Sequence, residues 1–346
     1  MNPISAVFEG KSACFFVKTK DPSILERNEF YRVDLDILDD LGLTTTIVTD
    51  IRHIKKADVY VVWWWTWAFI PLLQAKLLGK PVIIVGAFDH VMPDGKFQIF
   101  PNRPLVQKAL IRWALKAAKT NIVCSEDQRE LMTRMFKSSP IEVIPQVLNT
   151  YLYAPADQAR EPFFLTVCWM NKDNAIRKCV ATSIRAMAAV HKQLPDHRLI
   201  IVGDKGDGYP VLAELVKELN AEAFVEFSGV ISQSEKIDLM QRCTAYLQPT
   251  LAEGFGVAIL EAMSCGAPVI VSPVGAVPSV VSECALFVDG MDPNGLADAM
   301  HNLTTDAALG AQLSLQGRAR AVKEFSYSRR LGDFRRILTS AMQVRS

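Results

Sequence analysis

Clustered cysteines and histidines are absent from this sequence. The 346 residues include seven cysteines and five histidines, and no two cysteines are spaced Cys-x-x-Cys. Cysteines scattered in this way indicate neither a zinc site nor the framework of a small disulfide-rich secreted protein. We therefore expect no structural metal and a reducing, cytoplasmic environment, in line with a start that lacks the basic and then apolar layout of a signal peptide.

An excess of charge of one sign is also absent. Lysine and arginine number 38 and aspartate and glutamate 37, for a net charge of +1, which argues against nucleic acid as a partner. Half of the residues are apolar and 22% are charged, a balance typical of a soluble α/β protein. The length is sufficient for two domains of ordinary size.

The sequence also lacks an early glycine fingerprint and an uncharged run long enough to span a membrane. The late glycines within residues 203–208 do not have the Gly-x-Gly-x-x-Gly spacing, which argues against a dehydrogenase. Residues 59–75 carry no charge and include four tryptophans, but a membrane span needs about 20 residues. We expect a buried strand that runs into a helix.

The most informative stretch is residues 249–271. It predicts a strand end, a turn with Gly254 and Gly256, a helix over 256–265 and a buried strand over 269–271. The glycines allow a sharp turn or the close approach of a ligand. Free N–H groups at the start of such a helix form a site for an anion or for a sugar hydroxyl oxygen.

Two glutamates flank this turn. Glu253 lies in the turn itself, and Glu261 lies about one and a half turns into the predicted helix. Both carboxylates could reach one ligand that lies across the helix start, and vicinal sugar hydroxyls suit them because each hydroxyl can donate to a carboxylate oxygen. The alternative is an ordinary strand, turn and helix with two solvated glutamates.

The run Glu-Gly-Phe-Gly-Val-Ala-Ile-Leu-Glu over residues 253–261 closely resembles the donor-site signature of retaining nucleotide-sugar glycosyltransferases with the GT-B fold, the large family 4 group. The resemblance continues over residues 227–230, 239–249 and 275–281. It implies that Glu253 contacts the donor sugar and Glu261 the nucleotide ribose, and that relatives contact the base near the position of Val230. The implied donor loop comprises Gly254, Phe255 and Gly256.

Two basic residues are candidates for contacting the donor diphosphate. Relatives have Gly-Arg after the first strand of the second half and Lys-Gly further on, and here these places hold Cys-Trp at 168–169 and Arg-Lys-Cys at 177–179. Lys178 matches the family lysine and, with Glu253, is the catalytic candidate. Arg177 either replaces the missing arginine or faces solvent.

Strands and helices alternate in two series, which predicts an α/β protein with two Rossmann-like, doubly wound parallel sheets that face each other across a cleft. A polar, proline-bearing linker over 149–162 separates the two series. We expect an acceptor-binding domain over 1–155 and a nucleotide-sugar-binding domain over 156–326. In relatives the final helix, here about 327–346, packs back on the first domain.

The string Asp34-Leu-Asp36 is the Asp-x-Asp pattern that binds a metal in GT-A transferases. It falls inside a predicted helix over 28–41, where residues two apart point in different directions. We therefore interpret it as a solvated helix face, which leaves no metal site.

Two segments of the first half bear on the acceptor and on attachment. Asp89 and His90 follow a predicted strand over 81–85, at the edge where open α/β sheets bind ligands, so they are either acceptor-side residues or structural hydrogen-bond partners. Residues 102–119 predict an amphipathic helix that either docks on an anionic membrane or covers the sheet with a solvated outer face. Its expected basic stripe is Lys108, Arg112 and Lys116, and its expected apolar stripe is Leu105, Ala109, Trp113 and Ala117.

The resemblance implies a retaining glycosyltransferase that moves a hexose from a UDP- or GDP-linked donor to a hydroxyl of a sugar, glycan or lipid-linked acceptor, without a metal or other cofactor. Three departures from the family pattern keep an alternative open: Trp169, Ser279 in place of a common glutamate, and the lack of a glycine loop after the first strand. The alternative is a catalytically inactive protein that binds a nucleotide sugar.

Overall fold

The computed structural model describes residues 7–87, 100–137 and 139–343. The chain forms two compact units, which we call unit 1 (Met1–Leu148 with Phe325–Ser346) and unit 2 (Asn149–Glu324). The change of unit comes seven residues earlier than the boundary expected after residue 155, because residues of the linker already pack within unit 2. Tyr153, for example, is buried there and donates from its hydroxyl to Glu261 Oε1 at 2.9 Å.

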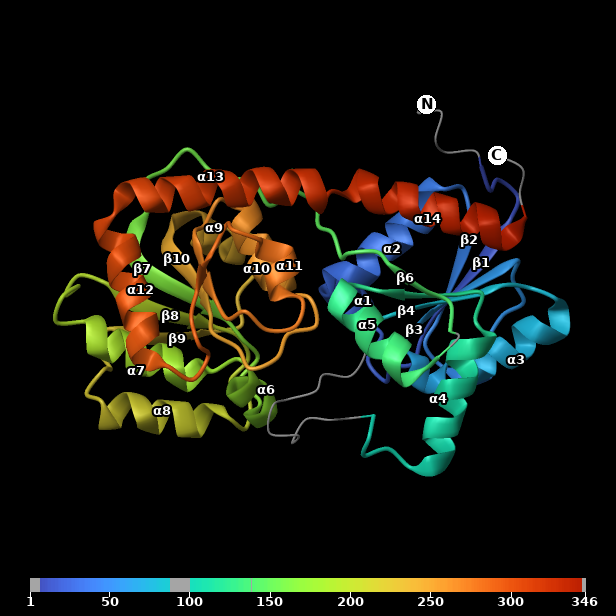
Figure 1. Ribbon diagram of the computed structural model, residues 1–346, viewed down its shortest axis with the longest axis horizontal. Coiled ribbons are helices and arrows are strands. Elements are labelled where there is room, and N and C mark those ends of the chain that lie inside the picture. Colours follow the sequence, from blue (N-terminus) through green and yellow to red (C-terminus); the bar gives the residue numbers. More distant parts are fainter. Residues whose placement is uncertain (1–6, 88–99, 138, 344–346) are drawn as a thin grey trace. The chain divides into compact units, whose positions relative to one another are not determined.

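Unit 1 contains a six-stranded sheet in the order β2-β1-β3-β4-β5-β6, and every neighbouring pair is parallel (Figure 1). The strands are β1 (Ser12–Val17), β2 (Thr44–Val48), β3 (Val59–Trp63), β4 (Val82–Val85), β5 (Thr120–Val123) and β6 (Ile141–Val143). The helices are α1 (Ile24–Arg27), α2 (Glu29–Asp40), η1 (Ile51–His53), η2 (Trp65–Trp67), α3 (Phe69–Leu78), α4 (Leu105–Ala117), α5 (Glu126–Met135) and α14 (Tyr327–Met342).

Unit 2 contains a second six-stranded parallel sheet in the order β12-β11-β10-β7-β8-β9. The strands are β7 (Glu161–Val167), β8 (Arg198–Val202), β9 (Val225–Gly229), β10 (Cys243–Gln248), β11 (Val269–Val271) and β12 (Leu286–Phe287). The helices are α6 (Lys172–Arg177), α7 (Val180–Val190), α8 (Tyr209–Glu218), α9 (Gln233–Arg242), α10 (Val257–Ser264), α11 (Val277–Val281), α12 (Pro293–Thr305) and α13 (Ala307–Glu324).

Both sheets are doubly wound, as predicted, and each has a point where the strand order reverses. In unit 1 this point lies between β1 and β3, and in unit 2 it lies between β7 and β10. Strands such as β3 and β4 are buried along their whole length, which is why they read as continuous apolar runs. Ligands of open α/β sheets bind outside the carboxyl ends of the strands at such reversal points, so each unit has one edge of this kind.

The uncharged tryptophan-rich run forms β3, then η2, then most of α3, which confirms the predicted strand followed by a helix. None of the helices within residues 7–87, 100–137 and 139–343 is long and apolar enough to cross a membrane.

The interpretation of Asp34-Leu-Asp36 as a solvated face was wrong for Asp34. The side chain of Asp34 is fully buried and accepts from Arg330 of α14, at 2.7 Å from Nε and 3.1 Å from Nη2. Arg330 is buried as well and donates to the backbone oxygens of Ile144 and Pro145. The helix α14 therefore covers this face of α2, and Asp36 is the exposed member of the string.

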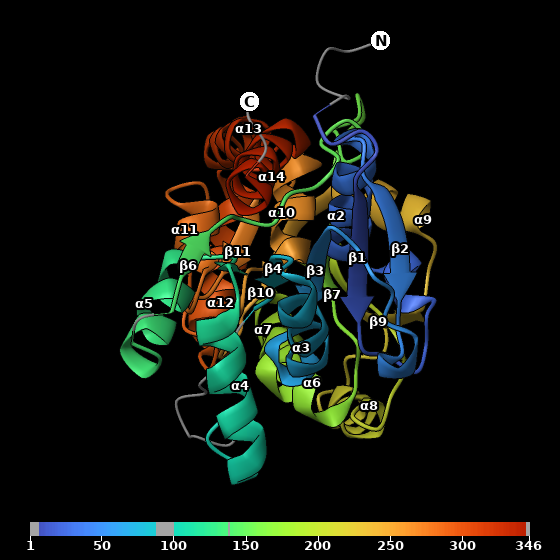
Figure 2. The same cartoon turned by 90° about the vertical axis from the view of Figure 1, so that its right-hand side faces the viewer.

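The expected apolar stripe of α4 was wrong except at Trp113, which packs against the core of unit 1. The buried residues of α4 are Ile111, Ala114 and Leu115, whereas Leu105 is 81% exposed. The helix α4 lies beside α3 in unit 1 (Figure 2). The true apolar stripe is therefore rotated relative to the expected one, and the first turn of α4 extends beyond the core.

Candidate active site

The loop that follows β10 is fixed by close backbone packing. A Cβ on Gly275 would lie 2.2 Å from the backbone oxygen of Glu253, so only glycine fits there. Gly256 has φ +91° and directly precedes α10. These two positions hold Glu253 in one place at the carboxyl end of β10, beside the reversal point of the unit 2 sheet.

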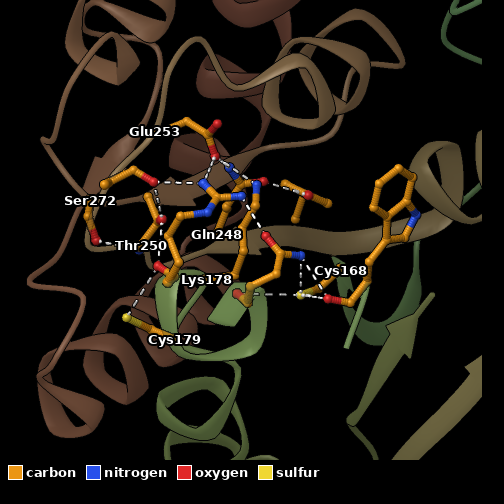
Figure 3. A network of polar contacts seen from close by, with 12 residues as sticks. Cys168, Lys178, Cys179, Gln248, Thr250, Glu253 and Ser272 are labelled. Carbon is orange, nitrogen blue, oxygen red and sulfur yellow. Dashed lines mark hydrogen bonds and ion pairs between the residues drawn. The ribbon is translucent and has the colours of Figure 1, made fainter. Parts of the chain in front are cut away.

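Several side-chain donors bind the carboxylate of Glu253 (Figure 3). Its Oε2 accepts from Lys178 Nζ at 2.7 Å, from Gln248 Nε2 at 2.9 Å and from Arg177 Nη1 at 3.3 Å. The side chains of Lys178 and Glu253 are each 11% exposed. The structure thus brings the two catalytic candidates into one ion pair, although they are 75 residues apart in the chain.

Arg177 does not face solvent. Its guanidinium donates to the backbone oxygen of Ala252 at 2.8 Å and to Asn174 Oδ1 at 2.6 Å, and its side chain is 19% exposed. Arg177 therefore contributes a second positive charge to the same cluster.

The backbone joins the end of α6 to the loop after β10. The backbone oxygen of Arg177 accepts from Thr250 Oγ1 at 2.8 Å and from the N–H of Leu251 at 2.9 Å. Thr250 in turn donates from its N–H to Ser272 Oγ at 3.1 Å. The labelled Thr250 and Ser272 lie beside the cluster in Figure 3, and this network fixes the positions from which Lys178 and Glu253 project.

Cys179 explains how the chain turns directly after Lys178. It has φ +47° and ψ +41°, the left-handed conformation that favours glycine. Relatives have Lys-Gly at this place, so the backbone keeps the shape that the resemblance implies while the residue differs. Burial raises the pKa of the Cys179 thiol to about 11, and burial likewise raises that of Cys168 to about 11, so neither thiol is an ionised nucleophile at neutral pH.

Glu261 lies at a separate carboxylate centre in α10. It is 5% exposed, and both of its oxygens accept from Lys236 Nζ at 2.8 Å. Its Oε1 also accepts from the Tyr153 hydroxyl, which itself accepts from Gln233 Nε2 at 3.0 Å. No pattern in the sequence points to Lys236 or Tyr153, because α9 and the linker come together with α10 only in the fold.

The remaining predicted donor residues are divided between buried and exposed positions. Phe255 is 5% exposed, while Val230 is 76% exposed after Gly229 at the end of β9. Gly254 lies between Glu253 and Phe255 in the same loop. Asp89 and His90, the predicted acceptor-side residues, lie outside the described residues.

Trp169 and Ser279, which depart from the family pattern, both lie in described parts of unit 2. Trp169 follows β7 and is 60% exposed, and its backbone oxygen accepts from Asn174 Nδ2 at 2.7 Å. Ser279 donates from its hydroxyl to the backbone oxygen of Ala276 at 2.8 Å, so it bonds within its own helix. Among the described residues, no three His, Cys, Asp or Glu side chains gather in a way that could hold a metal ion.

Chemically, the cluster combines the Glu253 carboxylate, in the loop after β10, with two cations from the end of α6. The carboxylate can accept hydrogen bonds from hydroxyls, and the two cations can stabilise an anion that approaches them.

Comparison with known proteins agrees with this fold. Residues 173–320 match the family model described as glycosyl transferases group 1. A GDP-mannose-dependent monoacylated alpha-(1-6)-phosphatidylinositol monomannoside mannosyltransferase of Corynebacterium glutamicum is 30% identical over 311 residues, covering 83% of this chain and 78% of that protein. An alpha-maltose-1-phosphate synthase of Mycolicibacterium smegmatis is 23% identical, covering 82% and 80%.

Solved structures share the fold. Anabaena HepE in complex with UDP-glucose has a TM-score of 0.77 at 16% identity and covers 95% of this chain and 100% of its own. Sucrose-phosphate synthase from Thermosynechococcus elongatus has a TM-score of 0.71 at 22% identity, covering 93% and 81%. From the family model, the relatives and the two doubly wound sheets together, the chain belongs to the GT-B glycosyltransferases of group 1.

Proposed function

We propose that the protein transfers a hexose from a nucleotide diphosphate sugar to an acceptor hydroxyl with retention of configuration and without a metal. The observation that carries this proposal is the cluster of Lys178, Arg177 and Glu253, in which two cations from the end of α6 meet a carboxylate from the loop after β10. The signature over residues 253–261, which resembles that of retaining enzymes, supports retention.

Departure of the diphosphate is the electrostatic problem of this reaction. Lys178 and Arg177 would stabilise the charge that grows on the leaving group, and with them the helix start after Gly256. Glu253 would hold the donor sugar through its hydroxyls, and Glu261 would hold the ribose. In this scheme both glutamates orient the donor and transfer no proton.

The donor is either UDP- or GDP-linked. The name of the Corynebacterium relative specifies GDP-mannose, and HepE was solved with UDP-glucose. Relatives include phosphatidylinositol glycosyltransferases, which supports a sugar, glycan or lipid-linked acceptor and a role in glycan, polysaccharide or glycolipid synthesis.

Peripheral attachment to the inner face of a membrane through residues 102–119 belongs to the same proposal. The first turn of α4 exposes Leu105 and Val106, at 81% and 73%. Arg112 and Lys116 are exposed further along the helix. Apolar side chains beside cations suit an anionic lipid surface. The other interpretation, a helix with a solvated outer face, stays open until lipid binding is measured.

The test is turnover of labelled UDP-glucose and GDP-mannose, measured as transfer to added sugars and as slow hydrolysis. Lys178→Ala is the informative variant, and Lys217→Ala is its control because Lys217 forms only an exposed pair with Glu214 on α8. Turnover by the wild type and the control but not by Lys178→Ala supports the proposal. Binding without turnover in the wild type supports the inactive nucleotide-sugar-binding protein, which the exposed Trp169 in place of an arginine favours.

A further inference from the structure

Unit 1 has a cavity at the reversal point of its own sheet. The cavity has a volume of about 260 Å³. Its lining residues lie at or just after the carboxyl ends of β1 and β3, or precede α4, and they are Lys18, Trp63, Trp64, Thr66, Trp67 and Arg103. This is the edge at which open α/β sheets bind ligands, and the volume lies just below the range of about 300–1,000 Å³ for drug-sized ligands. A single sugar ring is an appropriate occupant.

The aromatic wall of this cavity is rigid. Trp63 packs against Phe30 and Tyr31, with ring centroids 5.1 Å and 4.9 Å apart. Trp64 donates from its indole Nε1 to the Tyr31 hydroxyl at 2.7 Å. Trp67 stacks on Phe69, with ring centroids 6.0 Å apart, and is 39% exposed, so part of its ring surface is open to a ligand. Aromatic faces of this kind contact the C–H groups of a ligand ring at little entropic cost.

Backbone strain supports a functional role for the wall. Trp64 has φ +74° and ψ +133°, a conformation that side chains rarely adopt. Its N–H donates to the backbone oxygen of Val85 at 2.9 Å. A Cβ on Gly86 would lie 3.1 Å from the Trp64 ring, so the neighbouring strand end is shaped to admit the tryptophan.

The polar part of the lining is positive. It contains Lys18 and Arg103 and the hydroxyl of Thr66, and none of the lining residues that the structure describes is acidic. Asp50 Oδ2 lies 3.7 Å from Lys18 Nζ, but Asp50 is already bound by Arg52, at 3.1 Å from Nε and 2.9 Å from Nη2. The Lys18 ammonium, 27% exposed, therefore keeps charge to offer to an anion.

We propose that this cavity binds the acceptor of the reaction, and that the acceptor is a sugar that carries a phosphate, phosphodiester or carboxylate. The sugar ring stacks on Trp67, and the anionic group lies between Lys18 and Arg103. The assignment of this sugar as the acceptor rests on the proposed transfer reaction, whereas binding of the sugar in the cavity does not depend on that reaction.

The experiment is equilibrium binding by calorimetry to the full chain, with saturating UDP or GDP present. The probes are glucose 1-phosphate, mannose 1-phosphate, glucuronic acid, neutral methyl glucoside and inorganic phosphate. We expect the anionic sugars to bind at least about tenfold more tightly than methyl glucoside and than phosphate, since a hydrogen bond to a charged group is worth a factor of this size. Equal binding of neutral and anionic sugars, or of phosphate and sugar phosphate, overturns the proposal.

Matched variants locate the binding. Lys18→Gln should weaken the binding of anionic sugars about tenfold or more and leave the binding of methyl glucoside nearly unchanged. Lys20→Gln, at an exposed neighbouring position, should change the affinity for neither. Trp67→Ala should weaken all the sugars but not phosphate, and Leu77→Ala, which truncates an 88% exposed side chain on α3, should be neutral. Unchanged binding in Lys18→Gln and Trp67→Ala, with folding verified, would place the sugar elsewhere.

Two further arms separate the possible sources and failures. Dodecyl glucosyl phosphate in detergent micelles, compared with glucose 1-phosphate in solution, tells a lipid-linked anion from a soluble one, and tighter binding of either upholds the class. Failure of the proposed transfer reaction would appear as a lack of nucleotide-sugar turnover. The binding measurements do not depend on turnover, so the two failures can be told apart.

Discussion

Removal of the Lys178 ammonium is the most direct test of the site. Lys178 Nζ lies 2.7 Å from Glu253 Oε2, and both side chains are 11% exposed. At an effective dielectric constant of about 20, unit charges at this distance interact by about 6 kcal/mol before desolvation is subtracted. In Lys178→Ala the Glu253 carboxylate keeps its hydrogen bonds to Arg177 and Gln248. We therefore expect the free energy of unfolding to fall by no more than one charged hydrogen bond contributes, which is about 1.5–3 kcal/mol.

The expected effect on catalysis is larger than the effect on folding. If Lys178 stabilises the departing diphosphate, its interaction strengthens during the reaction, so kcat should fall by roughly 100- to 1,000-fold, or about 3–4 kcal/mol. The donor KM should change much less. Glu253→Ala should lower kcat and raise KM, because the sugar that it holds changes shape as the bond breaks.

The assay is initial-rate kinetics over donor concentration, with circular dichroism and a denaturation curve for each variant. A double-mutant cycle with Lys178→Ala and Glu253→Gln tests whether the two groups act as one unit, in which case their losses should be far from additive. Wild-type kcat in a folded Lys178→Ala protein would refute the reasoning.

Four further outcomes are expected. Transfer should survive EDTA, and loss of activity that manganese restores would contradict the metal-free site. Glu261→Ala should chiefly raise the donor KM, and Lys236→Met should do the same in smaller measure because it removes only the partner of that carboxylate; a fall in kcat alone in either variant would argue against a ribose contact. Arg330→Met should destabilise unit 1 by about 3–5 kcal/mol in urea denaturation, because it leaves a buried carboxylate on α2 uncompensated, and an unchanged midpoint would show that the pair is dispensable. In liposome sedimentation the protein should bind anionic vesicles, and high salt should weaken this binding. The Leu105→Ser variant should bind these vesicles several-fold less than the wild type. Binding that changes neither with salt nor in this variant would show that residues 102–119 form a solvated face.

The sequence predicted the elements well where a local pattern determines them. The bounds of β11 agree residue for residue with the predicted strand over 269–271, and α10 differs from the predicted helix over 256–265 by one residue at each end. Buried parallel strands are continuous apolar runs, so the residues where such a strand begins and ends can be identified from the local sequence. The same holds for the turn at Cys179, where the resemblance pointed to a glycine and the backbone has a positive φ.

The predictions failed where the partner comes from a distant segment. Asp34 is buried by Arg330, 296 residues further on, and no helical periodicity within α2 contains that contact. The expected stripe of α4 follows a spacing of four residues from Leu105, but the first turn of this helix lies outside the core, and Ile111 and Leu115 face inward. Lys236 was not predicted as a site residue because its contact with Glu261 also depends on distant segments. It reaches Glu261 through the packing of α9 on α10.

Charge balance distinguishes the two carboxylate centres in a way that their spacing in the sequence does not. Glu253 is bound by two cations, Lys178 and Arg177, so these three side chains carry one net positive charge. The cation that binds Glu261 is Lys236, so that pair is neutral. A net positive cluster suits a group on which negative charge grows, and a neutral pair suits an uncharged diol, which accords with the proposed diphosphate and ribose contacts. Spacing shows only the two anions, and the cations that set their charge come from α6 and α9. The proposed difference in role between the two glutamates therefore depends on the fold around them.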